Sequence, residues 1–220
     1  MPGWQKLYEE EKGKNFEVIT VAEDTGGVKA AGQWITAAKP SYTAVIDDTH
    51  IVSTLYGMIN VPTGVWIDEK GRLVRPPETA FIDDRFKAFT HFSSATYLNA
   101  LRDWIEKGAK SQYTLSEDEM RRRLAVNSPE QSMAAAEFTL AEYLYKAGAG
   151  PDAIQHFKEA QRLDPGNWNY KRQAWALGDP KRDYSTTLLD EMKKSSKPFY
   201  PPPYLPGVKI EEKKDEKKDK

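Results

Sequence analysis

Segments typical of strands and of helices alternate in the N-terminal half of the chain, and this order constrains the fold more than any other feature. Residues Phe16 to Val21 are rich in β-branched types, as strands are, and Thr43 to Asp47 repeats that pattern. Between them, apolar residues recur at helical spacing from Val28 to Ala38, and Pro40 ends the helix. The alternation predicts an α/β unit.

Four further elements complete this unit, which we assign to residues 1–110. They are a helix from Pro2 to Gly13, a short helix from Ile51 to Tyr56, a hairpin of strands 64–67 and 73–74, and a closing helix from Ala95 to Lys107. Gly71 supplies the positive φ of the tight turn, so the hairpin strands pair antiparallel. Residues 76–93 are expected to be irregular and to pack their four phenylalanines on the body: Phe81, Phe86, Phe89 and Phe92.

Residues 16–78 resemble the later part of a thioredoxin fold of the TlpA/ResA type. The likeness lies in the loop from Asn60 to Thr63, in the hairpin from Val65 to Val74, and in the order of the elements. The resemblance implies an incomplete thioredoxin-like sheet with flanking helices. It also implies a cis bond between Val61 and Pro62, whose backbone pairs with an extended partner peptide.

The sequence contains no cysteine. Thiol-disulfide exchange requires a thiolate, for which no other side chain substitutes, so the chain is predicted to be redox-inactive and to act as a binding or scaffold module. Relatives carry Cys-x-x-Cys after a central strand, and both would lie upstream of Met1. The alternative is therefore a thiol-disulfide oxidoreductase with upstream cysteines, and a third possibility is a dimer that completes the sheet.

A second resemblance covers Ala134 to Pro165, which is similar to one tetratricopeptide (TPR) repeat. The matching positions are Leu140, Ala141, Leu144, Gly148, Ala153, Phe157, Ala160 and Pro165. Glu137 departs from the pattern, which has a large apolar residue there. The resemblance implies an all-α module over residues 131–178, in which a helix from Trp168 to Leu177 caps the hairpin.

The inner face of this hairpin would present Phe138, Glu142, Tyr145 and Lys146 as partner-binding residues, together with Val61 and Pro62 of the α/β unit. One repeat cannot bury its own apolar face, because about three are normally needed. The hairpin must therefore pack on the α/β unit or on a second copy of the chain. A purely structural role for it stays open beside ligand binding.

The remaining segments are a connector and a tail. Residues 111–130 are expected to form a helical connector that Ser116 caps. Residues 179–220 form a proline-rich and charged tail that we predict to be largely disordered. Within the tail, Pro201 to Tyr204 has the form of a WW-domain ligand, although a linker or a segment draped over the surface is favoured.

Charge and hydropathy limit the partners. The 32 basic and 33 acidic residues leave a net charge of −1, which does not favour nucleic-acid binding. The mean hydropathy is −0.71, and no apolar run reaches the roughly 18 residues of a membrane span. We expect a protein or peptide partner and a possible homo-oligomer. The chain as written is expected to be cytoplasmic, or periplasmic or secreted if an N-terminal segment is missing.

Other chemistry finds little support in the sequence. His50, His91 and His156 lack the spacing of a metal site, so neither metal nor cofactor is predicted. Asp47, Asp48 and His50 follow a strand and have the residue types of a cation or acid-base site. Carboxylates in that position more often cap the next helix, which is the interpretation we favour.

Overall fold

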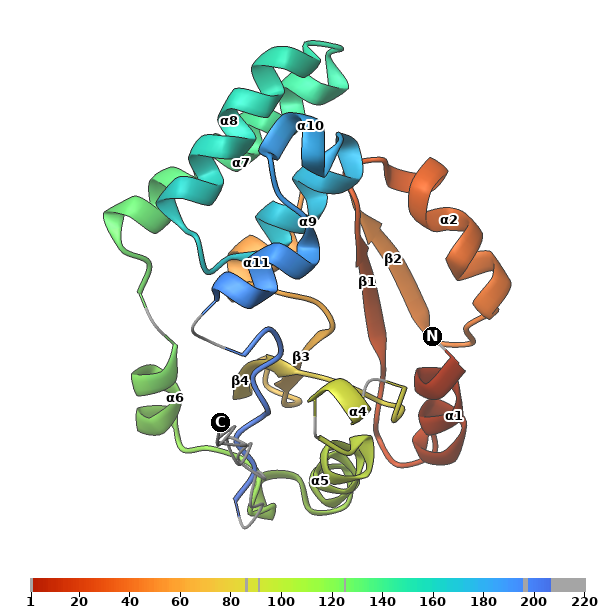
Figure 1. Ribbon diagram of the computed structural model, residues 1–220. Coiled ribbons are helices and arrows are strands. Elements are labelled where there is room, and N and C mark those ends of the chain that lie inside the picture. Colours follow the sequence, from red (N-terminus) through yellow and green to blue (C-terminus); the bar gives the residue numbers. More distant parts are fainter. Residues whose placement is uncertain (1, 86, 91, 125, 196–197, 207–220) are drawn as a thin grey trace, which may run out of the picture.

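The computed structural model describes residues 2–85, 87–90, 92–124, 126–195 and 198–206, in which helices accompany two small sheets (Figure 1). The mixed α/β class is therefore confirmed. The elements of the N-terminal unit are α1 (Pro2–Glu11), β1 (Ile19–Glu23), α2 (Gly27–Ala38), β2 (Thr43–Asp47), α3 (Ile51–Tyr56), β3 (Thr63–Ile67), β4 (Leu73–Thr79), α4 (Lys87–Thr90) and α5 (Ser94–Lys107). Apart from α4, which lies in the segment expected to be irregular, they follow the predicted order of strands and helices.

The strands form two separate pairs. β1 and β2 are parallel, from Ile19 opposite Thr43 to Glu23 opposite Asp47, and α2 connects them. β3 and β4 are antiparallel, and Gly71 takes the predicted positive φ of 74° in the turn. In the described residues no strand joins one pair to the other. Among the described strands, all four, β1 and β3 included, therefore keep one edge without a strand partner.

The second hairpin strand is longer than the sequence suggested, because β4 continues through Pro76 and Pro77 to Thr79. Proline lacks the N–H that a central strand must donate, but an edge strand tolerates it. β4 pairs only with β3 among the described strands, so this condition is met. Phe81 and Phe92 are buried as expected, whereas Phe86 and the side chain of Phe89 lie outside the described residues.

Trp66 of β3 lies at the centre of the core of this unit. Its indole Nε1 donates to the hydroxyl of Tyr97 over 3.0 Å, and its ring stacks on Trp104 at 5.1 Å between centroids. The guanidinium of Arg75 covers the indole at 5.4 Å. Buried around these groups are Leu7, Ala80, Phe81, Phe92, Ala100, Leu101 and Leu205.

The helical part contains α6 (Glu117–Arg123), α7 (Pro129–Lys146), α8 (Gly150–Leu163) and α9 (Trp168–Leu177). Ser128 and Gln131 form a capping box at the start of α7, and Gly148 turns the chain with a φ of 81°. α7 and α8 form a hairpin in which the small residues Ala134, Ala141, Ala153 and Ala160 are buried. Phe138 and Phe157 fill the space beside them.

Glu137, the departure from the repeat pattern, has a partner on the other helix of the hairpin. Its Oε2 lies 2.6 Å from Nδ1 of His156 on α8. Both side chains are partly buried. An ion pair or hydrogen bond therefore joins the two helices where the repeat pattern would place an apolar contact.

The α9 helix fixes the helical part to the α/β unit. The backbone carbonyl of Ile59, in the loop before β3, accepts from the amides of Trp168 at 2.7 Å and Asn169 at 3.2 Å. The side chain of Asn169 donates to the carbonyl of Met58 over 2.9 Å. These bonds satisfy donors at the helix N-terminus that have no partner within the helix.

The tail has more structure than we predicted. Residues 179–195 contain the short helices α10 (Pro180–Tyr184) and α11 (Leu188–Lys194), which Asp179 and Thr187 cap. Residues 198–206 are draped over the body, and Leu205 is buried in its core. The apolar anchors in the proline-rich stretch explain the difference, because they bury surface that a fully solvated tail would expose. Residues 207–220 lie outside the described part.

In the part of the chain that the structure describes, no helix has both the length and the apolar character needed to cross a bilayer.

Candidate functional site

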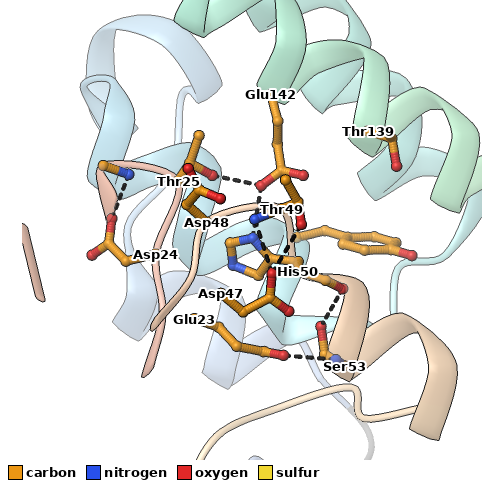
Figure 2. A network of polar contacts seen from close by, with 12 residues as sticks. Glu23, Asp24, Thr25, Asp47, Asp48, Thr49, His50, Ser53, Thr139 and Glu142 are labelled. Atoms are coloured by element: carbon orange, nitrogen blue, oxygen red, sulfur yellow. Dashed lines mark hydrogen bonds and ion pairs between the residues drawn. The ribbon is translucent and has the colours of Figure 1, made fainter. Parts of the chain in front are cut away.

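A polar network forms where the carboxyl ends of β1 and β2 meet the first helix of the hairpin (Figure 2). The loop after β1 contributes Thr25, and the loop after β2 contributes His50. The α7 helix contributes Glu142, whose side chain points toward both. Because parallel strands end at the same edge of a sheet, their following loops lie together and present polar groups to the helix.

Glu142 holds the centre of the network. Its Oε1 lies 2.7 Å from Nδ1 of His50 and accepts a hydrogen bond of 2.6 Å from the hydroxyl of Thr25. All three residues are buried, with relative exposures of 3% for His50, 3% for Glu142 and 4% for Thr25. The other oxygen of Glu142, Oε2, is buried and has no hydrogen-bond partner among the residues that the structure describes.

Asp47 and Glu23 bind the backbone at the start of α3. Oδ2 of Asp47 accepts from the amide of Val52 at 2.8 Å, and its Oδ1 accepts from the amide and hydroxyl of Thr49. Oε1 of Glu23 accepts from the amide of Ser53 at 2.6 Å. The capping role favoured for Asp47 is confirmed, and Glu23 shares it.

The imidazole of His50 is surrounded by carboxylates. Burial by itself lowers the pKa of His50, but Glu142, Glu23 and Asp47 outweigh it and hold that pKa above its ordinary value. Burial raises the pKa of Glu23, and the charge of His50 opposes that rise. Protonated His50 is thus the partner that offsets the negative charge collected between β1, β2 and α7.

Of the four residues expected on the inner face of the hairpin, two are inside the protein. Phe138 stacks on Tyr170 at 4.4 Å and meets the ring of His50 edge-on at 5.2 Å. Glu142 lies in the network described above. Both therefore contact the chain itself, and the α/β unit covers the face on which they lie.

Tyr145 and Lys146 remain at the surface. Lys146 donates to the backbone carbonyl of Asp48 over 2.7 Å, and its Nζ lies 3.2 Å from a carboxylate oxygen of the same residue. It forms the outer edge of the same contact between α7 and the loop after β2.

The bond between Val61 and Pro62 is cis, as the resemblance implied. The amide of Val61 donates to the side chain of Asn60 at 2.9 Å, and its carbonyl accepts from Arg172 of α9 at 2.8 Å. The carbonyl of Pro62 accepts from the amide of Ala80 at 3.2 Å. The backbone groups expected to meet a partner peptide therefore form hydrogen bonds within the chain.

The geometry of the network indicates a structural contact between α7 and the α/β unit. The Thr25 hydroxyl donates to the carboxylate rather than to the imidazole, so it is not paired with a base as a nucleophile would be. Among the described residues, no group of three or more His, Asp or Glu side chains is arranged to hold a metal ion. What the arrangement does is attach α7 to the loops after β1 and β2 by buried, charge-assisted hydrogen bonds.

Sequence reasoning missed Thr25 and Glu23 in this network, and one contact elsewhere in the hairpin. Thr25 was not singled out, since a threonine beside a Gly-Gly pair carries no signal of its own. The pairing of Glu137 with His156 was also missed, although the polar residue in an apolar position of the repeat pattern marked one partner.

Comparisons of the chain with protein-family models, with curated proteins and with solved structures each found no match.

Proposed function

We propose that this chain is a redox-inactive, thioredoxin-like protein that acts as a binding or scaffold module through its TPR-like hairpin. The outer face of α7 is the binding surface, and an α-helix of another copy of the chain docks on it. The observation that carries the proposal is a stripe of exposed apolar residues on that face. Its members are Met133, Ala136, Leu140 and Tyr143, called the α7 stripe below.

The α7 stripe lies on one side of the helix. At 3.6 residues per turn its four residues fall within an arc of about 80°. Met133 is 54% exposed, Leu140 41% and Tyr143 68%, and none of the four is charged. The opposite side of α7 carries Ala134, Phe138 and Ala141, which are buried.

Helix packing explains why another helix suits this face. In a repeat array each hairpin is covered on both sides by its neighbours. Here α9 packs on the hairpin through Trp168 and Ala174, whereas the α7 stripe is open to solvent. A second copy supplies an identical stripe, and two uncharged apolar stripes meet without charge repulsion in a two-fold arrangement.

The absence of cysteine supports the redox-inactive part of the proposal. Thiol-disulfide exchange proceeds through a thiolate and a mixed disulfide, and this sequence holds no sulfur able to form either. The buried network of Thr25, His50 and Glu142 supports the binding part of the proposal. The network holds the hairpin in place and leaves the outer face of α7 exposed.

Sedimentation velocity over a concentration series tests the proposal. We expect the wild-type chain to self-associate, and Leu140→Asp to stay monomeric because a carboxylate in the centre of the stripe must be desolvated on docking. Thr139→Asp is the matched control, since Thr139 is exposed on the same helix beside the stripe. A wild-type chain that stays monomeric throughout, or a Leu140→Asp chain that associates equally well, contradicts the proposal.

The second candidate is a thiol-disulfide oxidoreductase of the TlpA/ResA type. The free edges of β1 and β3 favour it, because the resemblance implies one more strand between them, followed by the cysteine pair. That strand and the cysteines would come from a segment outside this sequence. Reading the coding frame upstream of Met1 separates the candidates: a strand-like apolar run ending in Trp-Cys-x-x-Cys supports the enzyme.

A further inference from the structure

The proline-rich stretch of the tail lies along β4 and is bound there by side chains of the body. Residues 199–205 run opposite to the strand, with Pro201 beside Thr79 at its end and Tyr204 beside Arg75 nearer its start. Figure 1 shows this blue segment passing the β3–β4 hairpin. We call the surface beneath it, formed by Asn60, Arg75, Glu78, Thr79, Phe81 and Trp168, the tail groove.

Side chains of the tail groove bind the main chain of the segment. Asn60 Nδ2 donates to the carbonyl of Phe199 over 2.8 Å, and the Thr79 hydroxyl donates to that of Pro201 over 2.7 Å. The guanidinium of Arg75 donates to the carbonyl of Tyr204. Prolines have no N–H, so an extended proline-rich chain offers mainly carbonyl acceptors, and a row of donors is the complement it requires.

Aromatic rings hold the start of the segment. Phe199 meets Trp168 edge-on at 4.5 Å, Tyr200 meets Phe81 at 5.0 Å, and the two tail rings contact each other at 4.4 Å. Leu205 enters the core at the other end. Aromatic-lined grooves are the usual receptors for proline-rich segments.

One position of the segment must not be proline. The amide of Tyr204 donates to Oε1 of Glu78 over 3.1 Å, and Glu78 is itself held by three hydrogen bonds from Arg75 at 2.9, 2.9 and 2.7 Å. The Tyr204 ring lies 4.0 Å from the guanidinium carbon of Arg123. The residue that follows the three prolines therefore needs a free N–H, and its aromatic ring gains a cation–π contact.

We infer that the tail groove is a binding site for proline-rich segments of a partner protein, and that the chain's own tail occupies it as a competing ligand. The contacts that hold the tail are hydrogen bonds to main-chain atoms and packing of side chains, and none of them depends on covalent attachment. A partner segment with two aromatic residues, three prolines, an aromatic residue and a leucine makes the same contacts. This site is separate from the α7 stripe and stands if that proposal fails.

Fluorescence anisotropy with a labelled peptide of residues 198–206 tests the inference. The receptor is the full-length chain carrying Tyr200→Ala and Leu205→Ala, which loosen the resident tail and leave the tail groove intact. We expect saturable binding to this variant and binding weaker by about ten-fold or more to the wild-type chain, where the attached tail competes at a high effective concentration.

Two controls test whether the peptide uses the groove. A peptide with Tyr204→Pro lacks both the N–H that Glu78 accepts and the ring that contacts Arg123, and we expect about ten-fold weaker binding. Thr79→Val in the receptor removes the donor to Pro201 with little change of shape and is expected to weaken binding. Thr139→Val, on the exposed side of α7, is the matched change and is expected to have no effect.

The inference is overturned if the loosened variant, with a circular dichroism spectrum like that of the wild type, binds no peptide. Equal binding of a peptide of scrambled sequence overturns it too, as does a loosened variant that exchanges tails with a second copy instead of binding the peptide. If the double variant does not fold, the single variant Leu205→Ala replaces it. The same order of affinities is then required. The single variant must bind the tail peptide more tightly than the wild-type chain does, and it must bind the tail peptide more tightly than the proline-substituted peptide.

Discussion

Nδ1 of His50 lies 2.7 Å from Oε1 of Glu142, although 92 residues separate the two in the sequence. This contact joins the loop after β2 to α7 and so connects the α/β unit to the helical hairpin. Both groups are buried, and the hydroxyl of Thr25 shares the same carboxylate oxygen. The attachment of the hairpin thus depends on buried polar groups. If one of them is removed, the others have few alternative hydrogen-bond partners.

Replacing Glu142 by glutamine is expected to lower the free energy of unfolding by about 1–3 kcal/mol, because the imidazole and the Thr25 hydroxyl lose a charged acceptor. His50→Gln is expected to destabilise by a similar amount. Urea denaturation of both single variants and of the double variant measures the coupling between them. A coupling close to zero would show that the two side chains contribute independently.

Stability is expected to fall as the pH rises through the folded-state pKa of His50. The neighbours Glu142, Glu23 and Asp47 hold that pKa above the ordinary 6.5, so the folded state binds the proton more tightly than the unfolded state. The stabilisation is complete below the unfolded pKa and is lost above the folded one.

Denaturation curves between about pH 5 and pH 9 measure this loss. The Glu142→Gln variant is the control, since it removes the carboxylate that raises the pKa of His50 and should flatten the curve. The half-buried Glu23, whose pKa is also raised, acts in the same direction but in a window that begins near 4.5. A wild-type chain more stable at the alkaline end would contradict the assignment.

Ala141→Leu is expected to destabilise the protein by about 1–3 kcal/mol, because Ala141 is fully buried where α7 and α8 cross and a larger side chain forces the helices apart. Ala176→Leu places the same change on the exposed side of α9 and should shift stability little. Thermal denaturation of the two variants provides the comparison. Equal stabilities would mean that the helices do not approach closely at Ala141.

Leu205→Ala is expected to destabilise the protein by about 2–4 kcal/mol, as removal of a buried leucine side chain does elsewhere. This residue lies within a stretch that composition alone assigns to a solvated tail, yet it is buried beside Trp66 and Tyr97. Leu189→Ala, at an exposed leucine of α11, is the matched control and should change stability by less than about 0.5 kcal/mol. Chemical denaturation distinguishes the two results.

Local patterns predicted most of the elements because their causes are local. The β-branched run before Glu23, the helix that ends before Pro40 and the turn at Gly71 depend on near neighbours in the chain. The positions of the small residues in the hairpin could likewise be matched to a repeat pattern from the sequence, since spacing along a helix determines which side chains share a face. The extension of β4 through two prolines was not, because it depends on that strand being an edge.

The sequence by itself determined most of the strands and helices, the helical hairpin of α7 and α8, and the lack of a thiol. Only the tertiary structure decided that Glu142 faces His50 and Thr25, that the strands form two separate pairs, and that the tail packs along β4. The physical reason is the distance along the sequence over which each effect acts, because propensity and periodicity depend on only a few neighbouring residues. Burial of Glu142 or of Leu205 depends on which distant segments remove each side chain from water.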